Sequence, residues 1–152
     1  MCIRDSAQIY LHVVFSTKHR VPYLQDPALR ERTHGYLAGA CHNLGSPSII
    51  VGGVEDHVHV LCRLSKTLGA SELVRELKRE SSKWLKEQSA ELASFYWQSG
   101  YGAFAVSRSN EDEVAAYVAD QEEHHRVRTF QDEFRAFLRK HEIEFDERYL
   151  WD

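Results

Sequence analysis

The sequence predicts an α+β protein with a ferredoxin-like antiparallel sheet covered by helices. Strand-like segments with alternating apolar residues and helix-like segments follow one another in the order β-α-β-β-α-β-α-α. This order contains βαβ units with a split pair of strands, and it shows no internal repeat or low-complexity linker. Such an order is typical of ferredoxin-like domains, in which helices cover the sheet.

The first half of the chain supplies four of these elements. Residues 9–16 alternate and are rich in β-branched and aromatic side chains, which predicts a strand. A helix is expected next, with Asp26 as its N-cap, Pro27 in its first turn and Gly45 just past its end. Residues 47–65 then predict two antiparallel strands, because two glycines and a polar pair interrupt a β-rich run.

A clearly amphipathic helix is predicted over residues 70–88. At 100° per residue, one side carries its apolar residues, which are Leu73, Val74, Leu77, Trp84 and Leu85. The opposite, outward side carries a row of basic residues, which are Arg75, Lys78, Arg79, Lys83 and Lys86. This row is either an ordinary solvated helix face or a surface for nucleic-acid phosphates, and Lys18 and Arg20 are similar candidates.

The last third of the chain predicts one strand and two helices. Residues 95–107 have the composition of a strand. Asn110 and Glu113 form a capping-box pattern at the start of a helix, and Thr129 and Asp132 repeat that pattern at the start of the last one.

Composition favours a single soluble domain. The chain has 152 residues, of which 43% are hydrophobic and 28% charged, and this length suffices for one compact core. No apolar run approaches the roughly 20 residues of a membrane helix. We expect the domain to span residues 6–152. Residues 1–5 are expected to be a loose extension, because "MCIRDS" is not a secretory signal and does not continue the strand pattern.

Cysteine content and charge exclude some classes of protein. Cys2, Cys41 and Cys62 are odd in number and widely spaced, so neither a disulfide framework nor a zinc-finger pair is indicated, and a reducing cytoplasm is expected. The net charge of −4 does not suggest a nucleic-acid partner for the molecule as a whole. Any binding of DNA or RNA would depend on a local patch.

Two pairs of residues could carry chemistry. His57 and His59 are two positions apart in a predicted strand, so their imidazoles share a face and could hold a metal, or could simply lie on a wet face. Tyr117 and Gln121 lie four apart on a predicted helix. Tyr117 could bring a hydroxyl nucleophile to the histidines, and Gln121 could bring an oxygen ligand. The alternative is that Tyr117 is a core aromatic and Gln121 a surface residue.

Five motifs occur together in one order. They are "HVVFSTKHRVP" near the start, then "DHVHVL", "WQSGYGAFAVS" and "YVADQEEHH", and "FDERYLWD" at the end. Together they resemble the HUH single-tyrosine transposases of the insertion-sequence-200 type, over residues 6–152. The resemblance implies a ferredoxin-like fold with an additional C-terminal helix that carries or follows the nucleophile. It also implies a homodimer that cleaves and rejoins single-stranded DNA with hairpin ends.

The resemblance assigns roles to individual residues. His57 and His59 match the paired histidines, Tyr117 matches the nucleophile that forms a 5′-phosphotyrosine, and Gln121 matches the third metal ligand. The implied cofactor is Mg²⁺ or Mn²⁺, because neutral ligands leave the ion its full charge for phosphate oxygens. Asp120 stands where the family usually has Asn, which places an extra carboxylate next to Gln121 in the sequence. Because neighbouring side chains on a helix point in different directions, we expect activity to survive this difference.

The resemblance leaves further expectations and alternatives. In the family, the helix with the tyrosine commonly completes the histidine pair of the partner subunit, which implies composite active sites. The expected contacts to DNA are Lys18, Arg20, Arg75, Lys78, Arg79 and Lys83. The alternatives are a domesticated single-strand nicking enzyme of the same chemistry and a catalytically inactive dimer that binds DNA hairpins.

Overall fold

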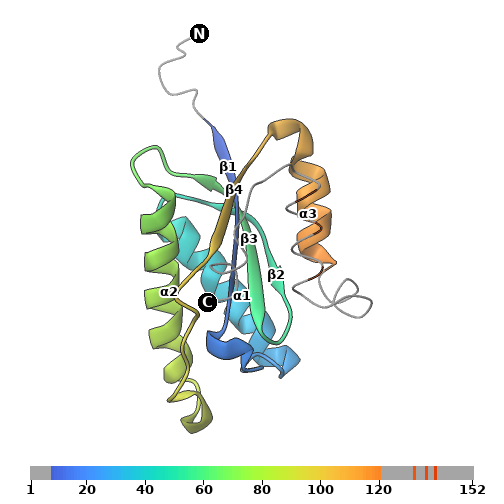
Figure 1. The fold of residues 1–152 in the computed structure, drawn as a ribbon. Helices are drawn as coiled ribbons and strands as arrows, with labels where there is room; N and C mark the ends of the chain where they lie inside the picture. Colours follow the sequence, from blue (N-terminus) through green and yellow to red (C-terminus); the bar gives the residue numbers. More distant parts are fainter. Residues whose placement is uncertain (1–7, 121–131, 133–135, 137–138, 140–152) are drawn as a thin grey trace.

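The protein contains one antiparallel sheet with helices on both faces, in a computed structural model that describes residues 8–120 together with Asp132, Ala136 and Arg139 (Figure 1). The strands follow the order β2-β3-β1-β4, and every neighbouring pair is antiparallel. Their bounds are β1 (Ile9–Ser16), β2 (Ser48–Gly53), β3 (His57–Leu64) and β4 (Gly102–Val106). The predicted α+β class is confirmed, and β1 and β3 are the central strands.

Within residues 8–120, three helices flank the sheet. Two of them, α1 (Pro27–Asn43) and α2 (Ala70–Lys86), pack on one face, and α3 (Glu111–Ala119) packs on the other (Figure 1). Short 3₁₀ turns connect the elements: η1 (Lys18–Arg20), η2 (Ala90–Leu92) and η3 (Arg108–Asn110). Within the described residues, each helix is too short or too polar to cross a membrane.

The ends of α1 form where the sequence predicted them. The Asp26 side chain accepts a hydrogen bond from the backbone N–H of Ala28 at 3.1 Å, which satisfies one of the free donors of the first turn. Gly45 follows the helix with a φ of +71°, a left-handed conformation that glycine adopts without steric cost.

The main core lies between the sheet and the pair α1 and α2. Alternate residues of the central strands point into it, so Phe15 and Val60 are completely buried there. Cys41 and Cys62 lie in the same core, and both are free thiols, as the expectation of no disulfide framework requires. The opposite face of the sheet packs against α3 through a smaller cluster centred on Leu61, Val114 and Val118.

The α2 helix confirms its predicted apolar side, whereas Lys78 departs from its predicted basic side. Leu73, Leu77 and Leu85 are completely buried. Lys78, however, is half-buried, and its Nζ donates to the carbonyl oxygens of Gln98 and Gly100, both at 2.8 Å. Burial lowers the pKa of Lys78 to about 8. The prediction of an outward-facing row was therefore wrong for this lysine.

The last third of the described chain differs from expectation in two details. The strand predicted over residues 95–107 is shorter, because only Gly102–Val106 joins the sheet as β4. Trp97 forms an isolated bridge with Thr17. Asn110 is the N-cap of α3, as predicted, but its side chain makes no capping hydrogen bond. Asp132, Ala136 and Arg139 are helical, as expected for the last helix, whose other residues lie outside those described.

Candidate active site

His57 and His59 lie on β3, on the face of the sheet that α3 covers. Both side chains are completely buried. Their ring centroids are 5.1 Å apart, and the ring planes are inclined by 74°. The shared face predicted from strand geometry is confirmed, whereas the alternative of two histidines on a wet face is wrong.

The turn between β2 and β3 sets the position of His57. The backbone N–H of Val54 donates to the carbonyl oxygen of His57 at 3.1 Å, which closes the turn. Gly53 has a φ of +154°, and a Cβ atom at this position would overlap that same carbonyl group. Only glycine allows the chain to reverse this closely in front of His57.

Asp56 and Arg20 form a chain of polar contacts behind His57. An Asp56 carboxylate oxygen lies 2.8 Å from His57 Nδ1, and the other lies 3.4 Å from Arg20 Nε. Arg20 reaches Asp56 from η1, where both His19 and Arg20 have positive φ values, 56° and 59°. Such non-glycine conformations cost about 1–3 kcal/mol each and occur where the surrounding structure enforces them.

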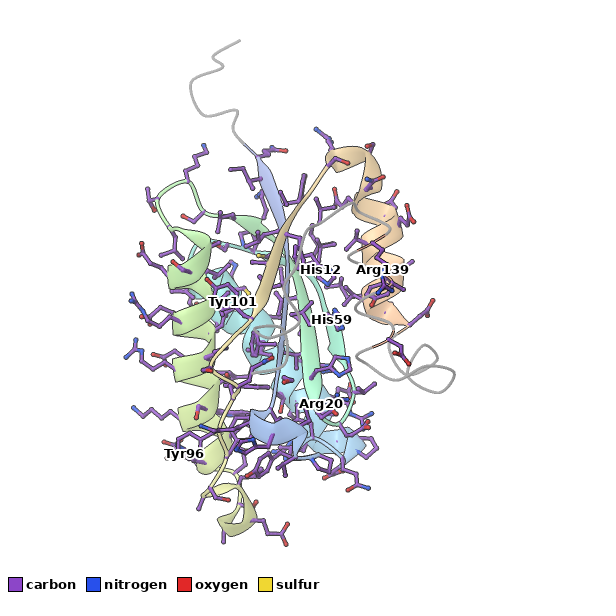
Figure 2. The ribbon with its side chains drawn as sticks, in the orientation of Figure 1. His12, Arg20, His59, Tyr96, Tyr101 and Arg139 are labelled. Atoms are coloured by element: carbon purple, nitrogen blue, oxygen red, sulfur yellow. The ribbon has the colours of Figure 1, made fainter. Side chains whose placement is uncertain are left out.

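His59 contacts a third histidine. His12 lies on β1, and its Nε2 is 2.9 Å from His59 Nδ1. The two rings are stacked, with centroids 5.2 Å apart, and both side chains are completely buried. Figure 2 shows His12 and His59 close together on the central strands. Sequence analysis missed His12, although its place between Leu11 and Val13 in an alternating strand puts it on the face opposite the core.

Tyr117 of α3 lies against these histidines. Its ring centroid is 5.6 Å from that of His59 and 6.1 Å from that of His12, both in edge-to-face geometry. The side chain is half-buried and packs on the cluster of Leu61 and Val118. The structure therefore brings three of the residues singled out by sequence, His57, His59 and Tyr117, together within one chain. Gln121 lies outside the described residues.

Gly52 determines how closely α3 approaches the sheet. It pairs with His59 across the β2–β3 ladder, and a Cβ atom on it would overlap the carbonyl oxygen of Val118. The backbone of α3 thus rests directly on β2, one helix position from the nucleophile candidate.

Gly52→Ala is expected to displace α3 and to separate Tyr117 from His59. Because the neighbour is backbone and cannot rotate away, we expect a loss of about 1–3 kcal/mol in the free energy of unfolding. Chemical denaturation measures this loss. The matched control is Gly39→Ala in α1, where a Cβ meets nothing within 4 Å. It should stabilise the helix by about 0.5–1 kcal/mol. Equal stability of the two variants would contradict this role of Gly52.

The donor set at the histidines fits part of a metal site. Asp56 and His12 contact the Nδ1 atoms of His57 and His59, so Nε2 is the ring atom that each histidine would offer to a metal. In the part of the chain that the structure describes, no group of three or more His, Cys, Asp or Glu side chains could hold an ion. The pair therefore fits a metal together with a ligand of another kind, such as the amide predicted at Gln121.

The candidate DNA contacts divide into two groups. Lys18, Arg75 and Lys83 are exposed. The others interact within the chain: Arg20 with Asp56, Lys78 with backbone carbonyls, and Arg79 with Glu76 and Glu80. Since α2 and α3 pack on opposite faces of the sheet, the α2 residues lie across the sheet from the histidines. Only Arg20 of these candidates contacts the site directly.

Two solved structures share the fold of this chain. A protein of Deinococcus radiodurans, named as a candidate transposase, matches with a TM-score of 0.59 and 18% identity over 76% of this chain and 92% of its own. A REP-associated tyrosine transposase bound to a REP hairpin matches with a TM-score of 0.58 and 12% identity over 77% of this chain and 68% of its own. At these identities, both show a shared fold. Curated proteins gave no match.

The family comparison covers most of the chain. A family model described as "Transposase IS200 like" matches residues 5–121, which include His57, His59 and Tyr117. The matched region runs from β1 to the end of α3 and includes all the strands and helices labelled above. The chain belongs to the IS200-like transposase family.

Proposed function

We propose that this protein cleaves and rejoins single-stranded DNA at the ends of an insertion sequence through a covalent 5′-phosphotyrosine. The observation that carries the proposal is the placement of Tyr117 on the buried histidines, with ring centroids 5.6 Å apart for Tyr117 and His59. A tyrosine packed on one of a pair of imidazoles brings a nucleophile side chain to potential metal ligands.

In the proposed reaction, phosphorus exchanges its bond to the 3′-oxygen of the DNA for a bond to the tyrosine oxygen. The Tyr117 Oη atom attacks phosphorus and loses its proton, the bond from phosphorus to the 3′-oxygen breaks, and that oxygen takes up a proton. Only about one tyrosine in a thousand is ionised at neutral pH without assistance. Mg²⁺ or Mn²⁺, bound by His57, His59 and Gln121, would supply Lewis-acid stabilisation of the phosphate. The protein link conserves the phosphodiester energy, so another 3′-hydroxyl can attack it and rejoin DNA.

Access to the site requires a local movement. His57 and His59 are completely buried, and α3 lies over His59. The cluster that holds α3 has only three fully buried apolar residues among those described, whereas the core under α1 and α2 has many more. Opening on the α3 side therefore costs much less free energy than unfolding of the domain.

A labelling experiment tests the proposal directly. The protein is incubated with Mg²⁺ or Mn²⁺ and single strands that carry candidate element ends, labelled at either terminus. A 5′-phosphotyrosine keeps the downstream fragment, so a denaturation-resistant adduct should carry the 3′-terminal label only. The 5′-terminal label should appear on a shorter free strand. An adduct that carries the 5′-terminal label would refute the proposed polarity, and binding without any adduct would favour the non-catalytic hairpin-binding alternative.

We further propose that the partner is DNA with hairpin ends. The REP-associated relative was solved bound to a REP hairpin, and the fold of the two proteins is shared. Among the candidate phosphate contacts, Lys18, Arg75, Arg79 and Lys83 are exposed. Arg20, Lys78 and Arg79 are expected to contribute less, because their charges are engaged within the chain. A domesticated nicking enzyme would share these features but would not join the cleaved strand to new DNA.

Lys83→Ala is expected to weaken DNA binding in a salt-dependent manner. Loss of one phosphate contact on a single strand should reduce the slope of log affinity against log salt concentration by roughly 0.7. Fluorescence anisotropy at several salt concentrations measures the slope. Arg32→Ala, which removes an exposed cation of α1 outside the predicted contacts, serves as the control. Identical slopes for the two variants would show that Lys83 makes no phosphate contact.

A mixing experiment determines which subunit supplies each half of the site. The family resemblance implies a homodimer with composite sites, whereas in this chain Tyr117 contacts its own His59. If this geometry is the active one, a mixture of His57→Ala and Tyr117→Phe subunits should remain inactive. Exchange of α3 between subunits would instead restore one intact site per mixed dimer. Light scattering of the wild type tests the dimer itself.

A further inference from the structure

The Nδ1 atoms of the two paired histidines contact two different kinds of side chain. His57 Nδ1 faces a carboxylate oxygen of Asp56 at 2.8 Å, and His59 Nδ1 faces His12 Nε2 at 2.9 Å. Asp56 is 6% exposed and His12 is completely buried, so both contacts are shielded from competing water. Neither partner belongs to the predicted set of nucleophile and ligands.

We propose that Asp56 and His12 are positioning residues, which hold the protons of His57 and His59 on Nδ1 and so keep both Nε2 atoms unprotonated for a metal. The role in metal binding rests on the proposed function. The protonation pattern, in contrast, is a property of the metal-free protein and can be measured independently. It extends the site from the strand that carries the histidine pair to a second strand and to the turn before β3.

The Asp56 contact determines the tautomer of His57 by itself. An ionised carboxylate only accepts hydrogen bonds, so the neutral His57 ring must carry its proton on Nδ1. Arg20 lies 3.4 Å from the other carboxylate oxygen, which limits the rotation of the Asp56 side chain. The strained η1 turn places Arg20 in contact with Asp56 and so helps to fix the Asp56 side chain.

The His12 contact permits two proton arrangements, and only one suits a metal ligand. If His12 Nε2 donates, His59 carries its proton on Nε2 and cannot use that atom as a ligand. If His59 Nδ1 donates, His12 accepts through Nε2 and is itself protonated on Nδ1. Metal-binding histidines generally donate their other N–H to a fixed acceptor. We therefore assign the second arrangement.

His12 also links the ligand to the nucleophile. Its ring is stacked on His59 at 5.2 Å and meets the ring of Tyr117 edge-on at 6.1 Å. A change in the size of this side chain would therefore disturb both neighbours, so a test of positioning has to preserve volume. Glutamine places an acceptor oxygen near the location of His12 Nε2, whereas phenylalanine keeps the ring and removes the acceptor.

The first test measures protonation directly. Long-range ¹H–¹⁵N NMR spectra of the labelled, metal-free protein distinguish Nδ1 from Nε2 protonation. We expect His57 and His59 to be protonated on Nδ1 in the wild type and in His12→Gln. In His12→Phe the ring of His59 should shift toward Nε2 protonation, and in Asp56→Leu the ring of His57 should do the same. A wild-type His59 protonated on Nε2 would overturn the assignment, even if a variant fails to fold.

The second test measures metal affinity without DNA or turnover. Electron paramagnetic resonance of free Mn²⁺ should show a dissociation constant raised about 10–100-fold in His12→Phe and Asp56→Leu. The conservative His12→Gln variant should remain within about 3-fold of the wild type. His42→Phe, which changes an exposed histidine of α1, is the matched control and should have no effect.

The two tests separate this inference from the proposed function. A wild-type protein that does not bind Mn²⁺ would refute the proposed metal site, while the NMR spectra would still decide the tautomers. A wild type that binds Mn²⁺, with equal affinity in His12→Phe and Asp56→Leu, would refute the positioning roles alone. Rescue by His12→Gln would show that the acceptor atom at position 12, and not only the packing, is required.

Discussion

Replacing Tyr117 with phenylalanine is expected to abolish the covalent protein–DNA adduct and to lower the rate of strand cleavage by about 10⁴-fold or more. The variant lacks the only atom that the proposed reaction uses as nucleophile. The phenylalanine ring keeps the edge-on contacts with His59 and His12, whose centroids lie 5.6 and 6.1 Å away. The packing of α3 and the affinity for hairpin DNA should therefore change little.

Gel analysis of labelled single strands under denaturing conditions measures the adduct, and anisotropy measures binding. The matched control is Tyr101→Phe, which removes the hydroxyl of a tyrosine that is 44% exposed. Tyr101 lies on the side of the sheet near α2, away from His59 (Figure 2). The control should cleave like the wild type. An adduct formed by Tyr117→Phe would refute the assignment of the nucleophile.

The substitution His57→Ala should separate chemistry from binding. It removes one of the two imidazoles that are proposed to hold the metal, so we expect cleavage to fall by about 10³-fold. The hairpin affinity should remain within about 3-fold, because the proposed phosphate contacts are the exposed cations Lys18, Arg75 and Lys83. Addition of a chelator to the wild type should reproduce this phenotype.

Loss of the buried imidazole also leaves a cavity and removes the Nδ1–H group that donates to the Asp56 carboxylate, so stability has to be measured alongside. Thermal unfolding monitored by circular dichroism provides that measurement. His42→Ala, at an exposed position of α1, is the control. A His57→Ala protein that unfolds cooperatively and cleaves at the wild-type rate would contradict a metal site at these histidines.

The elements that sequence analysis predicted well are those whose signals are local. β1 shows an alternating pattern within one segment, and α1 has its cap and its terminal glycine at Asp26 and Gly45. The segment before β4 was predicted less well, since its aromatic residues resemble a strand. Its carbonyl groups at Gln98 and Gly100 accept hydrogen bonds from Lys78 of α2. Such a tertiary contact has no signature within the segment itself.

The same distinction applies to the site. His57 and His59 could be identified because two positions in one strand share a face, and Tyr117 because of the family motif. His12 could not be assigned, because its contact with His59 depends on the register in which β1 pairs with β3, where His12 is opposite Leu61. Asp56 precedes His57 directly, yet only the geometry of the turn directs its carboxylate to Nδ1.

The alternation of β3 makes the length of the preceding turn critical. Val58 and Val60 point into the main core, while His57 and His59 point toward α3. Side chains along a strand have a period of two, so one residue inserted or deleted between Gly53 and His57 would exchange these two sets. Point substitutions in the turn alter single contacts. A change of one residue in its length would place imidazoles in the core and valines beneath the nucleophile, and the protein would lose its stability and its chemistry in the same step.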